Sequence, residues 1–192
     1  MSAKLKKRLF TVKEYHQMID IGILTKDDRV ELIEGEIIQM PAIGNRRASC
    51  AQKLIEVFNK LPENKAIVDD RTSVQLSKQT ELQPDLVLLQ FREDRLKNSI
   101  SEASDVLLLI EINDSNIADR DIKIPIYARS TIQEVWSIDL VENSLTVYRQ
   151  PTLNSYNLKL DLHQGQEIAP IGFPDFTVSV DAILPTINKS IV

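Results

Sequence analysis

Three acidic residues occupy positions in the sequence where an ionised carboxylate is costly or unusual. Glu111 interrupts the apolar run VLLLIEI, Asp85 opens the run DLVLL, and Glu31 begins the segment ELIEGEIIQM. An ionised carboxylate buried in a sheet costs several kcal/mol unless a partner or a metal ion compensates its charge. Each acid also has an ordinary explanation: Glu111 could stand in water at a strand end, Asp85 could be a turn residue, and Glu31 could face the surface.

Taken together, the acids point to the chemistry of a hard divalent cation. Mg²⁺ prefers oxygen ligands at about 2.0–2.1 Å, usually one or two carboxylates together with waters and phosphate. Two neighbouring strands that each present one carboxylate at the same end would supply the pair Asp85 and Glu111, and Ile112 could add its backbone carbonyl. A cation held there would polarise a phosphoryl oxygen and deliver a nucleophile derived from water.

Lys123 is the candidate for a positive charge beside this centre. It lies twelve positions after Glu111, on what is expected to be the following helix, where it could orient the attacking water or neutralise charge that develops on a phosphate. The ordinary alternative is a solvated lysine on the helix surface. On the helical wheel Lys123 adjoins Ile122, which with Ile126 is expected to pack against the sheet. Lys123 therefore lies at the border of the buried face, where its long stem could reach the site while its ammonium group stays solvated.

Other kinds of chemistry have little support in the sequence. The two histidines, His16 and His163, neighbour no candidate nucleophile in a recognisable motif, which disfavours a Ser–His–Asp arrangement. There is neither a GxxxxGKS/T loop nor a GxGxxG turn, so no nucleotide cofactor is expected. The single cysteine, Cys50, offers no internal disulfide and no zinc spacing. It falls on the apolar side of a predicted helix, where an unreactive buried thiol is expected.

The composition is that of a globular chain. Of its 192 residues, 43% are hydrophobic and 27% are charged, and no apolar run approaches the ~20 residues that cross a bilayer. The start of the chain lacks a signal-peptide core, so a cytoplasmic location away from membranes is expected. The formal net charge of -5 argues modestly against nonspecific coating of nucleic acid. The basic residues near the start are expected to form a solvated tail: Lys4, Lys6, Lys7 and Arg8.

The elements that must position these residues follow from hydrophobic periodicity. Helices are predicted after the capping-box sequence TVKE, ending near Gly22, and in the segments 48–58 and 119–129. Two strands are predicted within 30–40, around a hairpin turn at Glu34-Gly35. Further strands are predicted at 66–69, 72–76, 85–89, 106–112, 134–139 and 144–149, with weaker signals from 156 to 180. The fold class is therefore α/β (α+β mixed), with a central mixed sheet flanked by helices.

The order of several short segments resembles a known protein family. The segments are ELIEGEIIQM, QPDLVLL, LLLIEIND, DRDIKIPIYA, QEVWSIDL and VYRQP. In this order they resemble the bacterial Uma family of putative restriction endonucleases, a branch of the PD-(D/E)xK nuclease superfamily, from about Phe10 to Leu184. The resemblance implies a restriction-endonuclease-like core in a single domain, residues 10–185, between a flexible basic tail, residues 1–9, and a C-terminal tail, residues 186–192.

The resemblance also implies roles for the residues already singled out. Pro84-Asp85 would be the PD element, Glu111 the acid of the next element, and Glu31 an additional acid. The lysine normally found two positions after the acid is absent, because Asn113 stands there. In this family the lysine is carried by the following helix, where Lys123 lies within DRDIKIPIYA.

Two departures from the family pattern bear on activity. Arg47 stands near the start of the second helix, where related chains often carry a histidine, and this could alter contacts with the substrate. The segment between Glu111 and Lys123 is one residue shorter than usual, which could rotate Lys123 away and weaken the activity. Asp119 and Arg120 match the family pattern without an assigned role.

Three hypotheses about function follow. The first is a Mg²⁺-dependent nuclease, with Mn²⁺ as a substitute, that hydrolyses DNA. Its catalytic residues would be Glu31, Asp85, Glu111 and Lys123, and its metal ligands Asp85, Glu111 and Ile112. The second is a noncatalytic module that keeps the nuclease fold to bind nucleic acid or a protein partner. The third is a phosphohydrolase that uses the same site on smaller substrates. A homodimer is plausible, because two sites serve a two-strand cut.

Overall fold

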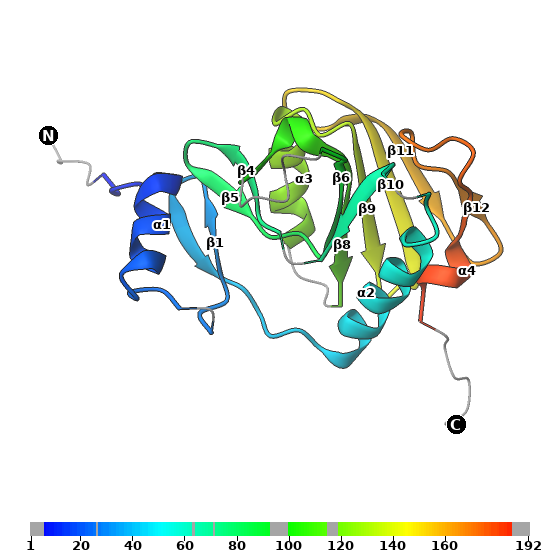
Figure 1. Ribbon diagram of the computed structural model, residues 1–192, viewed down its shortest axis with the longest axis horizontal. Helices are drawn as coiled ribbons and strands as arrows, with labels where there is room; N and C mark the ends of the chain where they lie inside the picture. The colour runs from blue at the N-terminus through cyan, green and yellow to red at the C-terminus, as the bar shows by residue number, and fades with distance from the viewer. Residues whose placement is uncertain are drawn as a thin grey trace, which may run out of the picture.

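The computed structural model describes residues 6–25, 27–62, 64–70, 72–92, 100–114 and 119–185. Within these ranges the chain builds two mixed sheets that pack against each other, with helices on the outside and between them (Figure 1). A further pair of short strands, β12 (Glu167–Ile168) and β13 (Val178–Ser179), lies near the C-terminal end. The predicted fold class, a mixed α/β arrangement with helices flanking a sheet, is confirmed, although the second sheet was not expected.

The larger sheet positions two of the predicted acids. In the described part of the chain it has six strands in the order β11–β10–β9–β8–β6–β3. Their bounds are Tyr156–Leu162, Ser144–Pro151, Glu134–Asp139, Val106–Asn113, Leu86–Gln90 and Ala66–Asp69. Only the pair β8 and β9 is parallel among these; β6 runs antiparallel to β8, with Leu86 opposite Ile110. The start of β6 therefore lies beside the end of β8.

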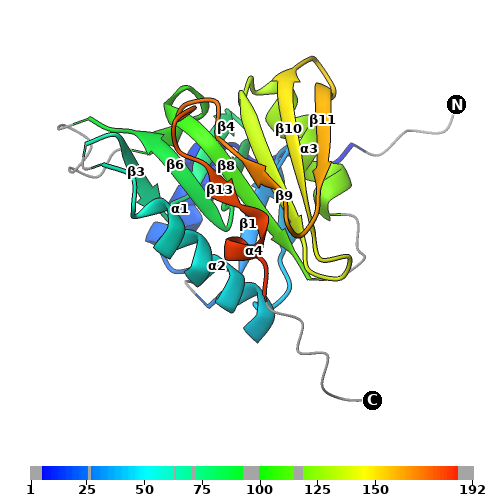
Figure 2. The ribbon, with the colours of Figure 1, turned by 90° about the vertical axis from the view of Figure 1, so that its right-hand side faces the viewer.

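Both faces of this six-stranded sheet are covered. On one face lie α2 (Asn45–Phe58) and the short α4 (Val180–Ile183), which Figure 2 shows on the side of the sheet turned toward the viewer. On the other face lie α3 (Asp119–Arg129) and the second sheet. Successive strand residues point to opposite faces, so Leu86 and Ile110 join the core under α2, whereas Val87 and Leu109 join the core under α3. Glu111 continues the second set and faces α3.

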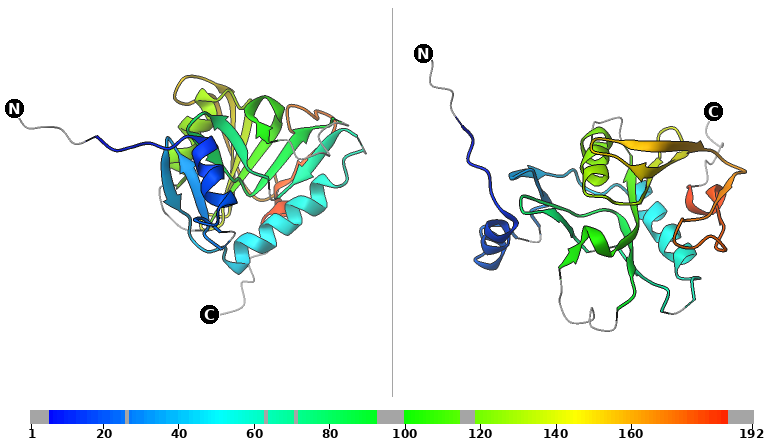
Figure 3. Two further views of the ribbon diagram at one scale, coloured as in Figure 1. Left: turned by 60° about the vertical axis from the view of Figure 1, so that its left-hand side comes forward. Right: turned by 90° about the horizontal axis from the view of Figure 1, so that it is seen from above.

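The second sheet has five strands within the described ranges, in the order β2–β1–β5–β4–β7. Their bounds are Glu36–Gln39, Val30–Ile33, Thr80–Leu82, Val74–Ser77 and Ser101–Glu102, and a short 3-10 helix, η2 (Ala103–Asp105), follows. Helix α1 (Val12–Asp20) packs on β1 through Val12 and Tyr15. Seen from above, α1 lies at the opposite end of the molecule from α2 and α4 (Figure 3, right).

Local sequence signals explain the edges of these elements. Thr11 caps α1 in a complete capping box with Glu14, as the TVKE sequence predicted. The hairpin of β1 and β2 turns at Glu34 and Gly35, which have φ angles of 49° and 83°. A side chain at Gly35 would be strained by this angle, and its Cβ would lie 2.6 Å from the Cβ of Leu9.

Helix α3 differs from the prediction in the face that it buries. Ile122, expected to pack against the sheet, is 51% exposed, whereas Lys123, expected to keep its ammonium group in water, is 1% exposed. The buried positions after Lys123 are Ile124, Ile126, Tyr127 and Ala128. The helix lies between the two sheets, so its buried stripe is wider than one sheet face would require, and that stripe includes the lysine.

Two further expectations concern Cys50 and membranes. Cys50 is buried, and its Sγ donates to the carbonyl oxygen of Ile183 at 3.2 Å, which confirms a buried thiol. Burial raises the pKa of this thiol to about 12, so its reactive thiolate form is scarce at neutral pH. None of the helices in the described ranges is both long and apolar enough to span a bilayer.

Candidate active site

Asp85 and Glu111 meet where β6 begins and β8 ends. Continuing the register of Leu86 and Ile110 by one residue brings Asp85 opposite Glu111. The backbone N–H of Ile112 donates to Oδ2 of Asp85 at 2.7 Å, which ties the carboxylate to the end of β8. The structure thus brings the two predicted metal ligands to one end of adjacent strands. Glu111 is 4% exposed, so the explanation of a solvated strand end is wrong.

Lys123 and Glu31 complete this group from two other elements. The Nζ of Lys123 lies 3.0 Å from Oε1 of Glu31, on β1, and 3.3 Å from Oε1 of Glu111, on β8. Glu31 Oε1 also accepts from the backbone N–H of Gln83 at 2.9 Å. Glu31 is buried, so the alternative of a surface residue is wrong for it as well. The shorter spacing between Glu111 and Lys123 does not keep the lysine away from the acid.

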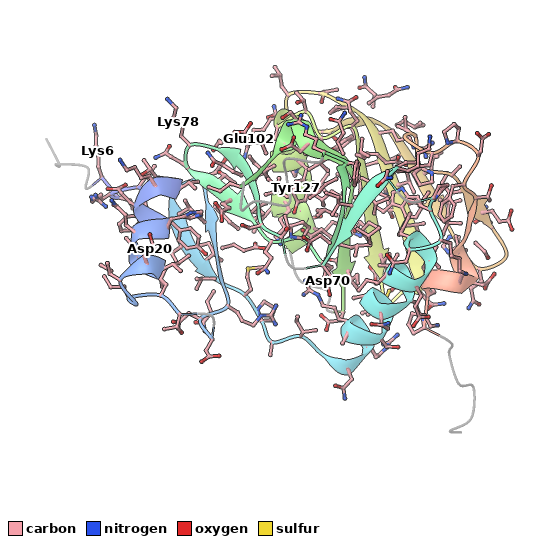
Figure 4. All side chains as sticks on the ribbon, in the orientation of Figure 1. Lys6, Asp20, Asp70, Lys78, Glu102 and Tyr127 are labelled. Atoms are coloured by element: carbon pink, nitrogen blue, oxygen red, sulfur yellow. The ribbon has the colours of Figure 1, made fainter. Side chains whose placement is uncertain are left out.

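Tyr127 contacts the carboxylate of Glu111 from one helical turn further along α3. Its hydroxyl donates to Oε1 of Glu111, and Figure 4 shows Tyr127 in the interior of the molecule, whereas Lys6 and Lys78 project outward. Sequence reasoning did not single out Tyr127. The signal was present, because a residue four positions after Lys123 lies on the same face of a helix.

The pKa of Glu111 reflects this crowded environment. Burial raises the pKa of its carboxyl group to about 7, with further upward contributions from the negative charges of Asp85 and Glu31. The ammonium group of Lys123 and the hydroxyl of Tyr127 act in the opposite direction. A carboxyl group with such a pKa changes its protonation state near neutral pH, and strongly shifted pKa values cluster at functional sites.

Arg47 forms the other strong contact of this site. From α2 its Nε donates to Oδ1 of Asp85 at 2.6 Å, and its Nη2 donates to Oδ2 at 2.9 Å. Both side chains are buried, and a planar guanidinium matches a carboxylate in this two-bond geometry. In the sequence, Arg47 is a departure from the family pattern that could alter contacts with the substrate. The ion pair with Asp85 is not predicted there, because the two residues lie 38 positions apart in the chain.

A cleft of about 870 Å³ opens onto the group. Its wall includes Glu31, Arg47 and Asp85, and it runs between the α1–β1 region and α2. The lining contains further acids, Asp28, Asp70 and Glu81, of which Asp70 is labelled in Figure 4. Lys123 and Glu111 are buried and do not belong to the lining of the cleft. The carboxylate of Asp85 is therefore the member of the predicted metal pair that the cleft reaches.

Glu81, a buried acid in the wall of the cleft, pairs with a half-buried histidine. Its Oε2 lies 2.7 Å from Nε2 of His16, and its Oε1 accepts from the hydroxyl of Ser73 at 2.7 Å. Glu81 comes from β5, a short strand that periodicity did not predict. Sequence reasoning set His16 aside because no nucleophile was near it in the sequence, and its carboxylate partner is 65 positions away.

The remaining basic and polar candidates lie outside the site. Arg120 approaches Asp121 at 3.6 Å and Asp139 at 4.0 Å, at the surface end of α3. Lys7 contacts Glu36 at 3.0 Å, and Lys4 lies outside the described residues.

The residues present fit a hard divalent cation by their chemistry. Two carboxylates, from Asp85 and Glu111, lie at the neighbouring ends of β6 and β8, and carboxylate oxygens are what Mg²⁺ and Mn²⁺ prefer. No cluster of three or more acidic, histidine or cysteine ligands occurs among the described residues. The two carboxylates instead contact protein cations, Arg47 at Asp85 and Lys123 at Glu111.

The fold is shared with a solved nuclease-like structure. The crystal structure of a putative nuclease belonging to DUF820 from Anabaena variabilis ATCC 29413 matches with a TM-score of 0.73, over 91% of this chain and 97% of that chain, at 18% sequence identity. This likeness places the chain in the same fold class. Among curated proteins none matches the chain.

The family is shown by its sequence model. The Uma2 family, described as "Putative restriction endonuclease", matches residues 12–181. The chain therefore belongs to the Uma2 family, and the resemblance found in the sequence is confirmed. Nuclease function is supported at this coarse level by the family.

Proposed function

We propose that this protein is a nuclease that hydrolyses DNA phosphodiester bonds with the help of Mg²⁺, for which Mn²⁺ can substitute. The observation that carries the proposal is the convergence of Asp85, Glu111 and Lys123, which come from three elements, at the end of two adjacent strands. Membership of the Uma2 family supports the same reading. A structural role alone would not require three acids and two cations to be buried together beside a cleft.

Asp85 and Glu111 would hold the cation, with the backbone carbonyl of Ile112 as a third oxygen donor. When bound, the cation would polarise the phosphoryl oxygen and make water a stronger nucleophile at neutral pH. Lys123 would orient the attacking water or neutralise charge on the phosphate. Glu31 would hold Lys123 in place through the contact of 3.0 Å and thereby act on the reaction through the lysine.

In this proposal the substrate would bind in the cleft beside α2. The cleft's volume of about 870 Å³ lies within the range of ligand sites, about 300–1,000 Å³, and accommodates a few nucleotide units more readily than a whole duplex. Arg29 and Arg47 are the basic residues among its lining. Phosphate groups bound in the cleft would contact these two guanidinium groups.

A noncatalytic nuclease-fold module is the second candidate, and one observation favours it. Both predicted metal ligands are already neutralised by protein cations, Asp85 by Arg47 and Glu111 by Lys123. A chain that uses these ion pairs only for folding would keep the same geometry without cleaving DNA. The net charge of -5 also disfavours tight nonspecific binding to a phosphate backbone.

The test is cleavage of supercoiled plasmid and of single-stranded DNA with Mg²⁺ or Mn²⁺, against an EDTA control. We expect cleavage by the wild-type protein, and loss of cleavage in Asp85→Asn. Asp28→Asn is the matched control, because Asp28 lines the same cleft but accepts from Thr25 at its mouth, and it should cleave normally. Absence of cleavage by the wild type on both substrates would favour the noncatalytic module. The homodimer and the cytoplasmic location stay predictions, testable by light scattering and by cell fractionation.

A further inference from the structure

Asp85 has little room for a cation in the geometry that the structure shows. Its Oδ1 accepts from Nε of Arg47 at 2.6 Å, and its Oδ2 accepts from Nη2 of Arg47 at 2.9 Å and from the N–H of Ile112 at 2.7 Å. Both side chains of the ion pair are more than nine-tenths buried. The guanidinium group therefore covers both oxygens of the carboxylate on the side where α2 meets the strands.

We infer that Arg47 is a built-in competitor for the divalent cation at Asp85, so that loading the site requires the guanidinium group to leave this carboxylate. The inference rests on the proposed function, because it presupposes a cation at Asp85. It assigns Arg47 a role in setting the affinity of that site for the cation, and it is independent of which DNA is cleaved.

The two cations exclude each other for steric and electrostatic reasons. A Mg²⁺ that approached Asp85 on the side where Arg47 lies would sit about 2.0–2.1 Å from the carboxylate oxygens, in the space that the Arg47 nitrogens occupy. A guanidinium left in contact would also place a unit positive charge against a divalent one in a partly buried site, where charges are weakly screened. Exchange of one for the other avoids both penalties.

A second carboxylate lies at the start of α2, the helix that carries Arg47. Asp114 lies beside the start of α2, where its Oδ2 would be 3.0 Å from a Cβ built on Gly44. Burial acts to lower the pKa of Arg47, but its bond to Asp85 and the charges of Asp85, Glu111 and Asp114 raise it overall. Arg47 also lines the cleft, and a displaced guanidinium group would turn into that space.

The test is calorimetric titration of the metal-free full chain with Mn²⁺ and with Mg²⁺. Arg47→Met keeps an apolar stem and removes the charge. It should bind the cation at least about tenfold more tightly than the wild type, a change of about 1.4 kcal/mol. Arg46→Met is the matched control: it removes the neighbouring charge, but Arg46 donates to the carbonyl of Leu140 at 2.5 Å, so the affinity should stay within about twofold. Asp85→Asn should abolish binding at this site.

The outcomes separate this inference from the proposed function. If Asp85→Asn abolishes binding but Arg47→Met binds no more tightly than the wild type, the competitor role is wrong and the metal site stands. If neither variant changes the affinity, the cation binds elsewhere, and both the inference and the metal part of the proposed function are wrong.

A measurement on the wild-type chain covers the case that Arg47→Met does not fold. The ¹⁵Nε–H resonance of Arg47, assigned by its absence in Arg47→Lys, should shift when Mg²⁺ is added, because its hydrogen bond to Oδ1 of Asp85 is lost. A resonance that stays in place while Mg²⁺ saturates the site would overturn the inference.

Discussion

Replacement of Lys123 by methionine should destabilise the protein severely. The side chain is 1% exposed and its ammonium group lies 3.0 Å from Glu31 and 3.3 Å from Glu111. Methionine fills a similar volume, so the change removes the charge and leaves the packing nearly intact. The two buried carboxylates then lose the cation that both contact.

The magnitude follows from the cost of breaking a buried ion pair, about 3–5 kcal/mol. Glu111 lessens this cost, because burial already raises its pKa to about 7 and Lys123 acts to lower that pKa. Without the lysine Glu111 will take up a proton more readily, so the loss falls mainly on Glu31, which keeps its hydrogen bond from the N–H of Gln83. We therefore expect the free energy of unfolding to fall by about 3 kcal/mol, or the melting temperature by about 6–12 °C for a domain of this size.

The assay is urea denaturation at neutral pH, followed by circular dichroism. Lys159→Met is the matched control, because Lys159 contacts Asp161 at 3.3 Å on the surface of β11, where both side chains are 54% exposed. That variant should change the free energy of unfolding by about 0.5 kcal/mol or less. Adding Glu31→Gln to Lys123→Met should restore part of the lost stability, because it removes the charge that the lysine had compensated.

A loss below about 1 kcal/mol for Lys123→Met, no larger than that of the control, would refute the buried position of the ammonium group. Stability alone cannot test the catalytic role, because burial predicts a large loss for a purely structural lysine as well. Single-turnover cleavage below the melting temperature of the variant separates the two roles. If Lys123 acts on the reaction, the rate should fall by orders of magnitude with DNA affinity unchanged.

Three further predictions concern other buried carboxylates. Mg²⁺ should raise the melting temperature of the wild type, and Asp85→Asn should remove most of that shift; an equal shift in both proteins would place the cation elsewhere. Because the pKa of Glu111 is about 7 in the folded state against 4.5 ordinarily, the folded state keeps a proton that the unfolded chain has lost between these pH values. The contribution of Glu111 to the free energy of unfolding should therefore fall by on the order of 3 kcal/mol as the pH rises from about 4.5 to 7. Metal-free urea titrations should show a flatter pH dependence in Glu111→Gln, and an unchanged slope would contradict the raised pKa of Glu111. Glu134→Gln should cost about 3–5 kcal/mol in urea denaturation and leave the affinity for Mn²⁺ unchanged, because Glu134 is fully buried against Arg149, Trp136 and the N–H of Ile171, outside the site; altered Mn²⁺ affinity would argue against that separation.

The parts of the fold that sequence predicted are those with a local cause. The capping box at Thr11 starts α1 where expected, and the Glu34-Gly35 turn joins β1 and β2 because both residues adopt positive φ angles. The apolar run that ends at Glu111 became a central strand covered on both faces. In each case neighbours along the chain supply the interaction that decides the structure.

The parts that sequence missed depend on partners far along the chain. The second sheet ends in a parallel pairing of β4 with β7, which the hydrophobic periodicity of the sequence does not predict. The buried face of α3 was misjudged because Lys123 was counted as a polar residue, whereas Glu31, 92 positions earlier, makes its burial tolerable. The contact of Arg47 with Asp85 has the same character, since only the crossing of α2 over the strand ends brings the two together.

The position of Lys123 also shows why the second sheet belongs to the site. Two positions after Glu111, Asn113 points its amide group toward β9, where it donates to Ser137 at 3.0 Å and to the carbonyl of Ile138 at 3.3 Å. β8 therefore supplies no cation at this position, and the cation comes instead from Lys123 on α3, which covers this face of the sheet. A lysine delivered in this way needs a second anion to hold it between the layers, and Glu31 on β1 provides that anion. The six-stranded sheet positions Asp85 and Glu111, the two acids that would bind a metal. The ammonium group of Lys123, which would act on the substrate, is held in place only when α3 and β1 pack against this sheet.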